Sequence, residues 1–543
     1  MNFADKIIKS NLIFTGCEDT PIGGAVIING NKITAVAADG EAEAYIGPET
    51  EIFEYKDQLV MPGLIDAHEH LWWGAVADSP HMVDITSSKS EEEAVRMIKK
   101  YADENPQEKR IRGFGWFPSN WNDAPLPTKE SLDAVFKDRP VYMLAADAHT
   151  GWLNSLALEE SGYYPGMELD GGSIGLDENG QMNGLIFEPD ALVHAWNKIY
   201  EFPEDEMEEI VNDFMAGLAS QGVTSISEMS ADAYNDAFYK RYSMFKKMAD
   251  EGKMTSRVHA FTQLMKRTDF STAVEWAKEF NGDIFKVSGL KGFLDGVAST
   301  YTAYLKEPYS DRPDTCGEGV PLATKESLEA SVIAGNAAGL PVRIHCIGDA
   351  AVSMALDAFE ASIKANGEHG LTNSIEHIET IDPSDIPRFK ELGVLASLQA
   401  EHLPLDSNEK IVRMGPERTR WQWPIKSLMD AGVDVAFGTD YPIVYYNQFI
   451  GIHASLTREN YDGTPSNQGV SDCEKISLAQ ALKANTAGGA AAYNRENEIG
   501  TIEAGKFADV IVLDRPLFGQ PDQAVKYAKV VLTIMDGNVI YTA

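Results

Sequence analysis

The chain carries an apolar run that ends in two histidines, Leu59-Val-Met-Pro-Gly-Leu-Ile-Asp-Ala-His-Glu-His70. A short apolar run of this kind is typical of a buried strand. Because side chains two apart on a strand point to the same face, His68 and His70 should leave it side by side, with Glu69 on the opposite face. Two adjacent imidazoles form half of a metal site. An isolated His-x-His pair is equally often a surface or packing feature. The rest of the chain must therefore show whether this pair belongs to a metal site.

Between the termini, short apolar runs alternate with amphipathic helical stretches over about residues 61–490. This alternation is typical of βα units around a parallel sheet, and eight strands is the count of a (β/α)8 barrel. The predicted strands are 61–67, 223–228, 257–264, 287–294, 341–347, 373–378, 394–400 and 435–440. Two further apolar runs, 111–116 and 140–147, exceed the eight strands that the barrel needs. We therefore expect a long insert, roughly residues 71–200, after the first strand.

The two ends of the chain have a different pattern. Residues 1–60 contain short alternating strands separated by tight turns such as Asn29-Gly-Asn31, which is typical of a small β-sandwich. Residues 491–543 repeat this pattern, with the turn Asp536-Gly537 between apolar runs. Since chain termini often lie close together, we expect both segments to form one composite β-sandwich domain beside the 61–490 barrel.

Length and composition narrow the classes of partner. With 543 residues, 44% hydrophobic and 24% charged, the chain has an ordinary globular composition and the length of about two to four domains. Its net charge of −37 argues against nucleic acid and anionic membrane surfaces as partners. The sequence shows no CxxC pair, no signal peptide and no apolar stretch of the roughly 18 residues that a membrane helix needs. We therefore expect a cytoplasmic protein.

Residues that can bind metals recur at the ends of the predicted strands, where barrel enzymes place their active sites. His345, His377 and Asp440 end three strands, and Lys291 lies in a fourth among small and apolar neighbours that solvate an ammonium poorly. Each has an ordinary alternative: a structural histidine, an ion pair of Lys291 with Asp295, or a turn cap by Asp440. Their joint recurrence favours a metal centre.

In this order, the histidine pair, the lysine, the two further histidines and the aspartate resemble the amidohydrolase superfamily. A larger set of motifs is similar to amidohydrolase family 3, the branch of YtcJ-like proteins and N-substituted formamide deformylase. These motifs are Gly113-Phe-Gly-Trp116 with Trp121 and Pro127-Thr128, Asp147-Ala-His-Thr-Gly-Trp-Leu-Asn-Ser155, Asp295-Gly-Val-Ala-Ser299, Ile344-His-Cys-Ile-Gly-Asp349, Ile375-Glu-His377, Ser397-Leu-Gln-Ala-Glu-His402, Gly438-Thr-Asp-Tyr-Pro442 and Gly500-Thr-Ile-Glu-Ala-Gly-Lys-Phe-Ala-Asp-Val-Ile-Val-Leu-Asp514. Two departures concern substrate choice: Asp147-Ala precedes His149 where the family more often has Gly or Ser, and Glu401 precedes His402 at a variable position.

The resemblance implies two divalent metal ions at the barrel mouth, zinc in first place, with Fe, Mn or Co as substitutes. It assigns the more buried metal to His68, His70 and Asp440 and the outer one to His345 and His377. Lys291 would bridge them as an N-carboxylated lysine, because an ammonium has no lone pair whereas a carbamate offers two anionic oxygens. Without that modification, a one-metal site is expected.

Such a centre activates a water and polarises the substrate carbonyl. Asp440 is the expected catalytic residue, which takes the proton of the nucleophile and passes it to the leaving nitrogen. The predicted reaction is hydrolysis of a non-peptide C–N bond of amide, formamide or N-acyl type. The predicted substrate contacts are His149, His402, Trp116 and Glu188, of which Glu188 is equally well interpreted as a solvated loop carboxylate.

Several tryptophans lie in or next to the insert, at Trp72, Trp73, Trp116, Trp121 and Trp152. An insert folded over the barrel mouth would supply an aromatic lid and favour a small-molecule substrate with a hydrophobic or aromatic part. Alternatively, these rings pack in the core of the insert itself. The sequence alone does not separate the two interpretations.

Other functions remain open, since a fold does not fix a reaction. An ester, lactone or carbamate hydrolase, or a decarboxylase, could use the same metal barrel. A non-catalytic binding protein on this scaffold would be expected to lack a ligand position, yet all the positions are present. A homodimer is compatible with the sequence, which does not determine the oligomeric state.

Overall fold

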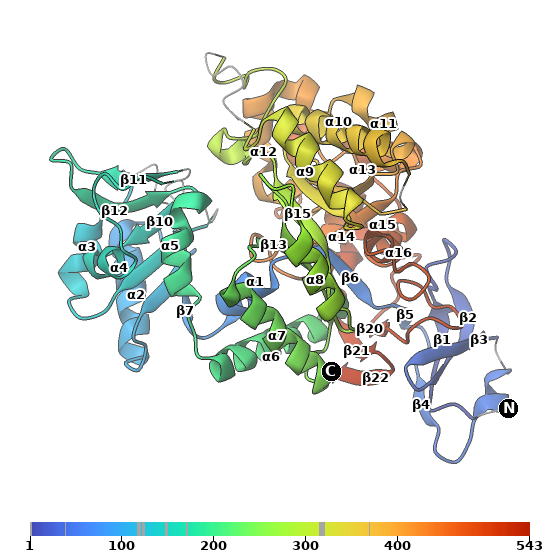
Figure 1. Ribbon diagram of the computed structural model, residues 1–543. Helices are drawn as coiled ribbons and strands as arrows, with labels where there is room; N and C mark the ends of the chain where they lie inside the picture. Colours follow the sequence, from blue (N-terminus) through green and yellow to red (C-terminus); the bar gives the residue numbers. More distant parts are fainter. Residues whose placement is uncertain are drawn as a thin grey trace. The chain divides into compact units, whose positions relative to one another are not determined.

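The computed structural model describes residues 3–38, 40–116, 121, 125–146, 150–169, 172–313, 321–368 and 370–543. The chain folds into two compact units, one of Met1–Leu71 with Met215–Ala543 and one of Trp72–Phe214 (Figure 1). The first unit contains a barrel and a sheet built from both ends of the chain, and the second contains a sheet of its own. The predicted insert, roughly residues 71–200, overlaps this second unit.

The predicted barrel is confirmed as a sheet of eight strands, in which each strand pairs in parallel with the next. Every strand overlaps one of the eight predicted runs. The strands are β6 (Leu64–Glu69), β13 (Val223–Asp232), β14 (Arg257–Gln263), β15 (Phe285–Phe293), β16 (Val342–Cys346), β17 (Ser374–His377), β18 (Leu395–Leu398) and β19 (Val435–Phe437).

Helices separate these strands along the chain and follow the last one. They are α7 (Asp236–Asp250), α8 (Ser271–Glu279), α9 (Lys325–Ala337), α10 (Asp349–Asn366), α11 (Ile386–Glu391), α12 (His402–Thr419), α13 (Ile425–Asp430), α14 (Gln448–Thr457), α15 (Leu478–Ala484) and α16 (Ala487–Ala492). Side-chain caps start several of them: Asn235 accepts from the Phe238 N–H, and Thr324 from the Ser327 N–H. Within the described part of the chain, no helix combines the length and the apolar composition that crossing a bilayer requires.

The barrel closes between its first and last strands through a seam of side-chain and main-chain hydrogen bonds. The Asp66 carboxylate accepts from the Thr439 N–H at 3.0 Å and from the Thr439 hydroxyl at 2.6 Å. One residue further, the Asp440 N–H donates to the His68 carbonyl at 2.6 Å. A Cβ atom at Gly438 would lie 2.4 Å from the His68 nitrogen, so only glycine allows this approach. The seam sets the histidine pair directly against Asp440.

Both ends of the chain contribute to one further sheet, in the order β22-β21-β20-β5-β1-β2-β3, with β4 paired to β1. Both ends of the chain thus share one sheet, as expected, while a separate β-sandwich domain of residues 1–60 and 491–543 stays a prediction. Its strands are β1 (Lys6–Ile13), β2 (Ile22–Asn29), β3 (Lys32–Ala37), β4 (Glu51–Glu54), β5 (Leu59–Pro62), β20 (Val510–Leu513), β21 (Val530–Met535) and β22 (Asn538–Thr542). Only Gly63 separates β5 from β6, so the terminal sheet leads directly into the first barrel strand.

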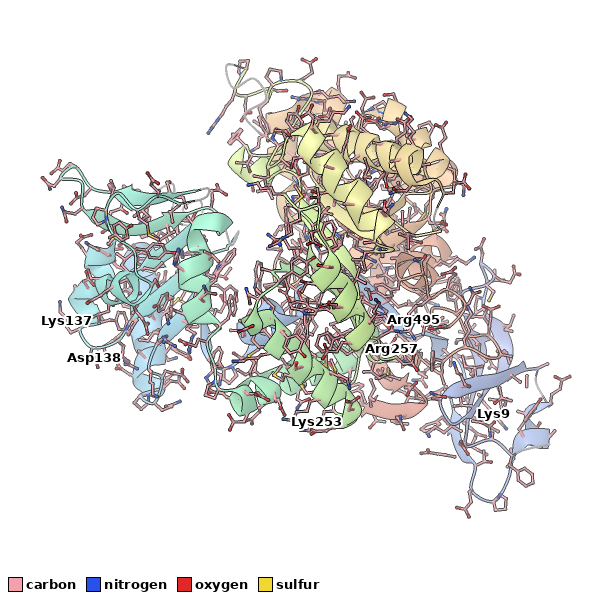
Figure 2. All side chains as sticks on the ribbon, viewed as in Figure 1. Lys9, Lys137, Asp138, Lys253, Arg257 and Arg495 are labelled. Carbon is pink, nitrogen blue, oxygen red and sulfur yellow. The ribbon has the colours of Figure 1, made fainter. Side chains whose placement is uncertain are left out.

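A buried arginine joins the barrel to the terminal sheet (Figure 2). Arg257, the first residue of β14, donates to the Asp509 carboxylate at 3.1 Å and to the Asp536 carboxylate at 3.0 Å. Its guanidinium also lies 4.3 Å from the centre of the Phe507 ring, and Arg495 approaches the same ring. Because a buried charge is stable only when it is paired, these contacts fix the start of β14 to the sheet.

The second unit is built on a six-stranded sheet in the order β11-β12-β10-β9-β8-β7. Its strands are β7 (Met82–Asp84), β8 (Ile111–Trp116), β9 (Val141–Ala145), β10 (Thr150–Leu153), β11 (Ser173–Leu176) and β12 (Met182–Phe187). The helices in this part of the chain are α1 (Leu71–Asp78), α2 (Glu91–Glu104), α3 (Lys129–Val135), α4 (Ser155–Glu160), α5 (Pro189–Ile199) and α6 (Glu204–Ser220). The two surplus runs of the sequence are therefore β8 and β9.

Three of the tryptophans of this unit pack against one another. The rings of Trp116, Trp121 and Trp152 lie 6.2–6.3 Å apart, and all three belong to a buried apolar cluster. The Trp116 indole N–H donates to the Met143 carbonyl, and that of Trp152 to the Thr128 carbonyl. These three rings therefore form the core of their own unit, as the second of the two interpretations expects.

Gly438→Ala is expected to lower the free energy of unfolding by roughly 1–3 kcal/mol, the usual cost of overpacking. The added methyl group would meet the His68 nitrogen at 2.4 Å and Asp66 Oδ1 at 2.8 Å, so the seam must open. Urea denaturation measures the change. Gly451→Ala is the control: its Cβ would lie on α14 with the nearest neighbour at 3.5 Å, and it should be neutral or stabilising. Equal stability of Gly438→Ala and wild type would contradict the seam.

Candidate metal centre

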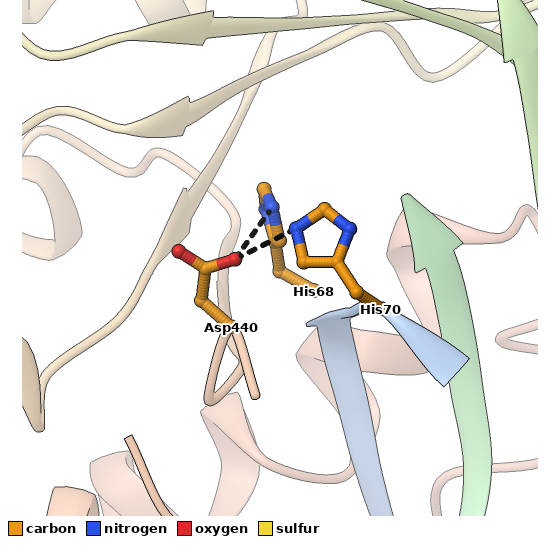
Figure 3. Close-up of side chains that lie close together, drawn as sticks. All are labelled: His68, His70 and Asp440. Atoms are coloured by element: carbon orange, nitrogen blue, oxygen red, sulfur yellow. Dashed lines mark hydrogen bonds and ion pairs between the residues drawn. The ribbon is translucent and has the colours of Figure 1, made fainter. Parts of the chain in front are cut away.

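Three side chains meet at the barrel mouth, where β6 and β19 end (Figure 3). His70 Nε2 lies 3.0 Å and His68 Nε2 3.4 Å from the same oxygen, Asp440 Oδ1. All three residues are buried. Their ligand atoms lie within 4.8 Å of one another, so the group could hold a metal ion. The strand alternation that suggested a shared face for the two histidines is consistent with this arrangement.

Burial and nearby charges keep His68 and Asp440 in the forms that bind a cation. Burial, together with the nearby Lys291, lowers the pKa of His68 to about 4, so its imidazole is neutral at neutral pH. Burial by itself raises the pKa of Asp440, but His68 and His70 outweigh this effect and hold the pKa well below its usual range. A neutral imidazole and an ionised carboxylate are the ligand forms that metals require.

Lys291 lies on β15, fully buried, with its Nζ 3.5 Å from His68 Nε2. Burial lowers the pKa of Lys291 to about 8, which makes the neutral amine easier to form than on an ordinary lysine. The ring of Phe293 lies 4.8 Å from Nζ. Asp295, the alternative ion-pair partner, directs its carboxylate at two main-chain N–H groups just after β16, at 2.9 and 3.0 Å.

Three further imidazoles lie beside this group, on His345, His377 and His402. The ring of His377 is 4.7 Å from that of His68, 4.4 Å from that of His345 and 6.3 Å from that of His402. His377, His402 and Asp440 form a second group whose ligand atoms lie within 4.8 Å. His345 belongs to neither group, and its Nε2 lies 3.4 Å from the carbonyl oxygen of Gly296.

The structure thus brings together all six residues that were predicted as ligands, and it adds His402 to them. Among the residues that the structure describes, the buried His377 Nδ1 has no hydrogen-bond partner. A buried, unpartnered nitrogen is costly unless a ligand pairs with it, which fits a cation at this position. The assignment of His345 and His377 to an outer metal stays a prediction.

Two carboxylates behind the histidine pair were not recognised in the sequence. Glu376 Oε2 lies 2.8 Å from His68 Nδ1. Burial raises the pKa of Glu376, but the hydrogen bond with His68 and the charge of Arg343 outweigh it and lower the pKa to about 2. The second, Glu228, accepts from the Ser230 hydroxyl, whose oxygen is 3.5 Å from His70 Nδ1. The sequence signal that could have revealed them is a charged residue within a predicted buried strand, because a buried charge needs a partner.

The predicted substrate contacts other than His402 belong to the second unit or are not described. His149 lies outside the described residues. Trp116 is buried in the core of its unit. Glu188 precedes α5 with φ 72°, a backbone conformation that few residues other than glycine adopt. Their contacts with a substrate stay predictions.

A small cavity of about 10 Å³ lies behind Asp440, between the ends of β18 and β19 and helix α14. Glu401, Thr439 and Gln448 are among the residues that line it. Within the described residues, Glu401 Oε2 and both amide atoms of Gln448 have no hydrogen-bond partner. A cavity of roughly this size can hold one water when polar partners face it, and these atoms of Glu401 and Gln448 are the candidates. Burial raises the pKa of Glu401 to about 8, so its carboxyl is protonated at neutral pH.

Glu401→Gln is expected to stabilise the protein by an amount that grows with pH. In the unfolded chain this carboxyl ionises near pH 4.5, whereas the folded protein retains the proton up to about pH 8. Between these values folding takes up a proton, so the wild type loses about 1.4 kcal/mol of stability per pH unit and the glutamine variant does not. Urea denaturation at several pH values measures the difference, which should level off above pH 8. A difference that is independent of pH would contradict the raised pKa.

Several known proteins are similar to this chain over nearly its whole length. A solved structure of an uncharacterised metal-dependent hydrolase from Pyrococcus horikoshii is similar with a TM-score of 0.78 and 26% identity, covering 95% of this chain and 99% of that one. The putative amidohydrolase YtcJ of Bacillus subtilis is 26% identical and covers 98% of this chain and 99% of its own length. N-substituted formamide deformylase of Arthrobacter pascens is 26% identical, over 95% of this chain and 94% of its own length.

The model of the amidohydrolase family matches residues 52–541, which span the barrel, the second unit and strands β5, β20 and β21 of the terminal sheet, whereas β1, β2 and β3 precede the match. The match includes every residue of the candidate metal centre. The resemblance drawn from the motifs is confirmed: the chain belongs to the amidohydrolase family, in the branch of amidohydrolase family 3.

Proposed function

We propose that the protein is a metal-dependent hydrolase that cleaves a non-peptide C–N bond, of amide, formamide or N-acyl type, in a small molecule. The observation that carries the proposal is the convergence of His68, His70 and an ionised Asp440 at the barrel mouth. The family supports hydrolysis, and the relative named N-substituted formamide deformylase supports a C–N bond as the target.

We assign two divalent metals to the centre, zinc in first place. The donors fit this choice, because imidazole nitrogens and carboxylate oxygens suit Zn and also Fe, Mn and Co. The inner ligands would be His68, His70 and Asp440. N-carboxylated Lys291 would join them to the outer ligands, and its burial favours the neutral amine that reacts with CO2. When bound, the metals supply a Lewis acid and a water of lowered pKa.

The two oxygens of Asp440 have different surroundings, which suggests separate roles. Oδ1 faces the histidine pair, whereas Oδ2 lies 3.8 Å from His402 Nε2. In the proposed mechanism Oδ2 accepts the proton of the attacking water and passes it to the leaving nitrogen. His402 lies beside this oxygen, in agreement with its predicted contact to the substrate. The Asp440 N–H bond to the His68 carbonyl fixes the loop while the proton moves.

A substrate screen tests the reaction class. Zinc-loaded protein is offered N-formyl amines, N-acyl amino acids, lactones and aryl esters, and the products are analysed for released amine, acid and alcohol. Amine release is the expected result. Turnover of esters or lactones without any amine release would replace the proposal with an ester or lactone hydrolase on the same centre.

Asp440→Asn is expected to lower kcat by roughly 10²–10⁴-fold, because the amide cannot accept the proton. Steady-state kinetics on the best substrate of the screen measures the loss. Asp434→Asn is the control, since Asp434 is exposed and lies just before the opposite end of the same strand, β19. Unchanged turnover by Asp440→Asn would rule out the assigned role.

Lys291→Ala is expected to reduce the metal content from two ions per chain to one, because the shared anionic ligand is lost. Elemental analysis after dialysis gives the stoichiometry. Native mass spectrometry of the wild type, reconstituted with zinc and bicarbonate, should show the mass of one added CO2. Two tightly held metals in Lys291→Ala would remove the carboxylated lysine from the proposal while leaving the hydrolase in place.

A further inference from the structure

A carboxylate lies directly behind the first of the proposed metal ligands. Glu376 Oε2 is 2.8 Å from His68 Nδ1, and both side chains are fully buried in the barrel. Glu376 belongs to β17 and His68 to β6, which are not neighbours in the sheet. The contact therefore crosses the barrel interior.

This contact selects one tautomer of His68. Donors surround the other carboxylate oxygen, with the Ser374 hydroxyl and the Arg343 guanidinium at Oε1, so Glu376 is placed as an acceptor; Nδ1 is then the donor and Nε2 carries the lone pair. Nε2 faces the barrel mouth, 3.4 Å from Asp440 Oδ1 and 3.5 Å from Lys291 Nζ. The nitrogen that would ligate a metal is thus the one that the contact leaves unprotonated.

Arg343 and Ser374 hold the carboxylate from its other side. The Arg343 guanidinium is fully buried, 3.9 Å from Glu376 Oε1, and the Ser374 hydroxyl donates to the same oxygen. Arg343 Nη1 also donates to the carbonyl of Ala67 at 2.9 Å. Because Ala67 directly precedes His68, one guanidinium anchors both the backbone of the ligand strand and the carboxylate behind the ligand.

We propose that Glu376, held by Arg343 and Ser374, is a positioning residue that fixes the tautomer and ring orientation of His68 for metal binding. The inference rests on the proposed function, since it requires His68 to be a ligand. Glu376 acts through His68 and contacts neither the metal nor the substrate. Carboxylates placed behind metal-binding histidines typically contribute about 10–100-fold to metal affinity or activity.

The alternative is that Glu376 and Arg343 form an ion pair that only stabilises the fold. The chain contains a second buried carboxylate–arginine pair that serves as a comparison. Asp509 and Arg257 form a buried pair at 3.1 Å where the barrel meets the terminal sheet, and Figure 2 labels Arg257. Loss of either carboxylate removes an anionic partner of a buried arginine, so both changes should lower the free energy of unfolding. Only the loss of the Glu376 carboxylate should alter metal binding.

The experiment compares Glu376→Gln, Asp509→Asn and the wild type as full chains. Zinc content is measured after dialysis, zinc affinity by competition with a chromophoric chelator, and the visible spectrum after cobalt substitution. We expect Glu376→Gln to bind zinc about 10–100-fold more weakly, with a changed cobalt spectrum. The glutamine amide can donate to Nδ1 and so place the proton on the metal side of the ring. Asp509→Asn should keep the wild-type affinity and spectrum.

Wild-type zinc affinity and cobalt spectrum in a folded Glu376→Gln variant would overturn the inference and leave the proposed hydrolase intact. If that variant does not fold, Ser374→Ala takes its place, because it removes one hydrogen bond to the carboxylate without unpairing a charge. Weaker zinc binding by Ser374→Ala supports the inference, and unchanged binding overturns it. A wild-type protein that binds no divalent metal would overturn both this inference and the proposed function.

Discussion

The hydrogen bonds of Asp66 to Thr439 determine where the other parts of the centre lie. They join the first and last barrel strands, and the adjacent bond from Asp440 to His68 brings together groups that are about 370 residues apart in the sequence. Closing so long a loop costs entropy that no local interaction repays, so the metal site exists only when the whole barrel has folded. Gly438 is part of the same constraint, since a side chain there would separate the strands before Asp440 could reach the histidines.

The barrel interior carries charges that stability alone would not select. Lys291, Arg343 and Glu376 are fully buried, and Asp440 is nearly so. Removing an ion from water costs several kcal/mol even after pairing, and apolar residues of similar volume often stabilise a core at least as well. Concentrations of this kind are expected at functional sites, where local rules of packing are violated and the rest of the fold compensates. The apolar clusters of the terminal sheet and the paired Arg257 lie outside the centre and provide that compensation.

The sequence predicted the barrel strands because each is a short apolar run, and it suggested ligand positions because His68, His377 and Asp440 lie within or just beyond the ends of such runs. It could not predict Glu376 or Arg343 in the same way, since their partners lie on other strands and only the closed barrel defines the pairs. The grouping of His402 with His377 also depends on side-chain directions beyond the strand ends, where alternation no longer applies. The tryptophans of the insert were ambiguous for another reason: composition cannot distinguish a ring that packs in a core from one that faces a ligand.

The charge of Lys291 affects how well the neighbouring ligands can bind a cation. As an ammonium, its Nζ lies 3.5 Å from the His68 nitrogen that faces Asp440, so a cation bound there would meet a like charge. Asp440 is the one carboxylate in both ligand groups of the described residues, and by itself it balances little of the charge of two divalent ions. Carboxylation would exchange a positive for a negative group next to His68, a member of the first ligand group. In the proposed centre, the number of metals would therefore depend on the charge state of this lysine more than on the number of histidines, which is sufficient for one metal or for two.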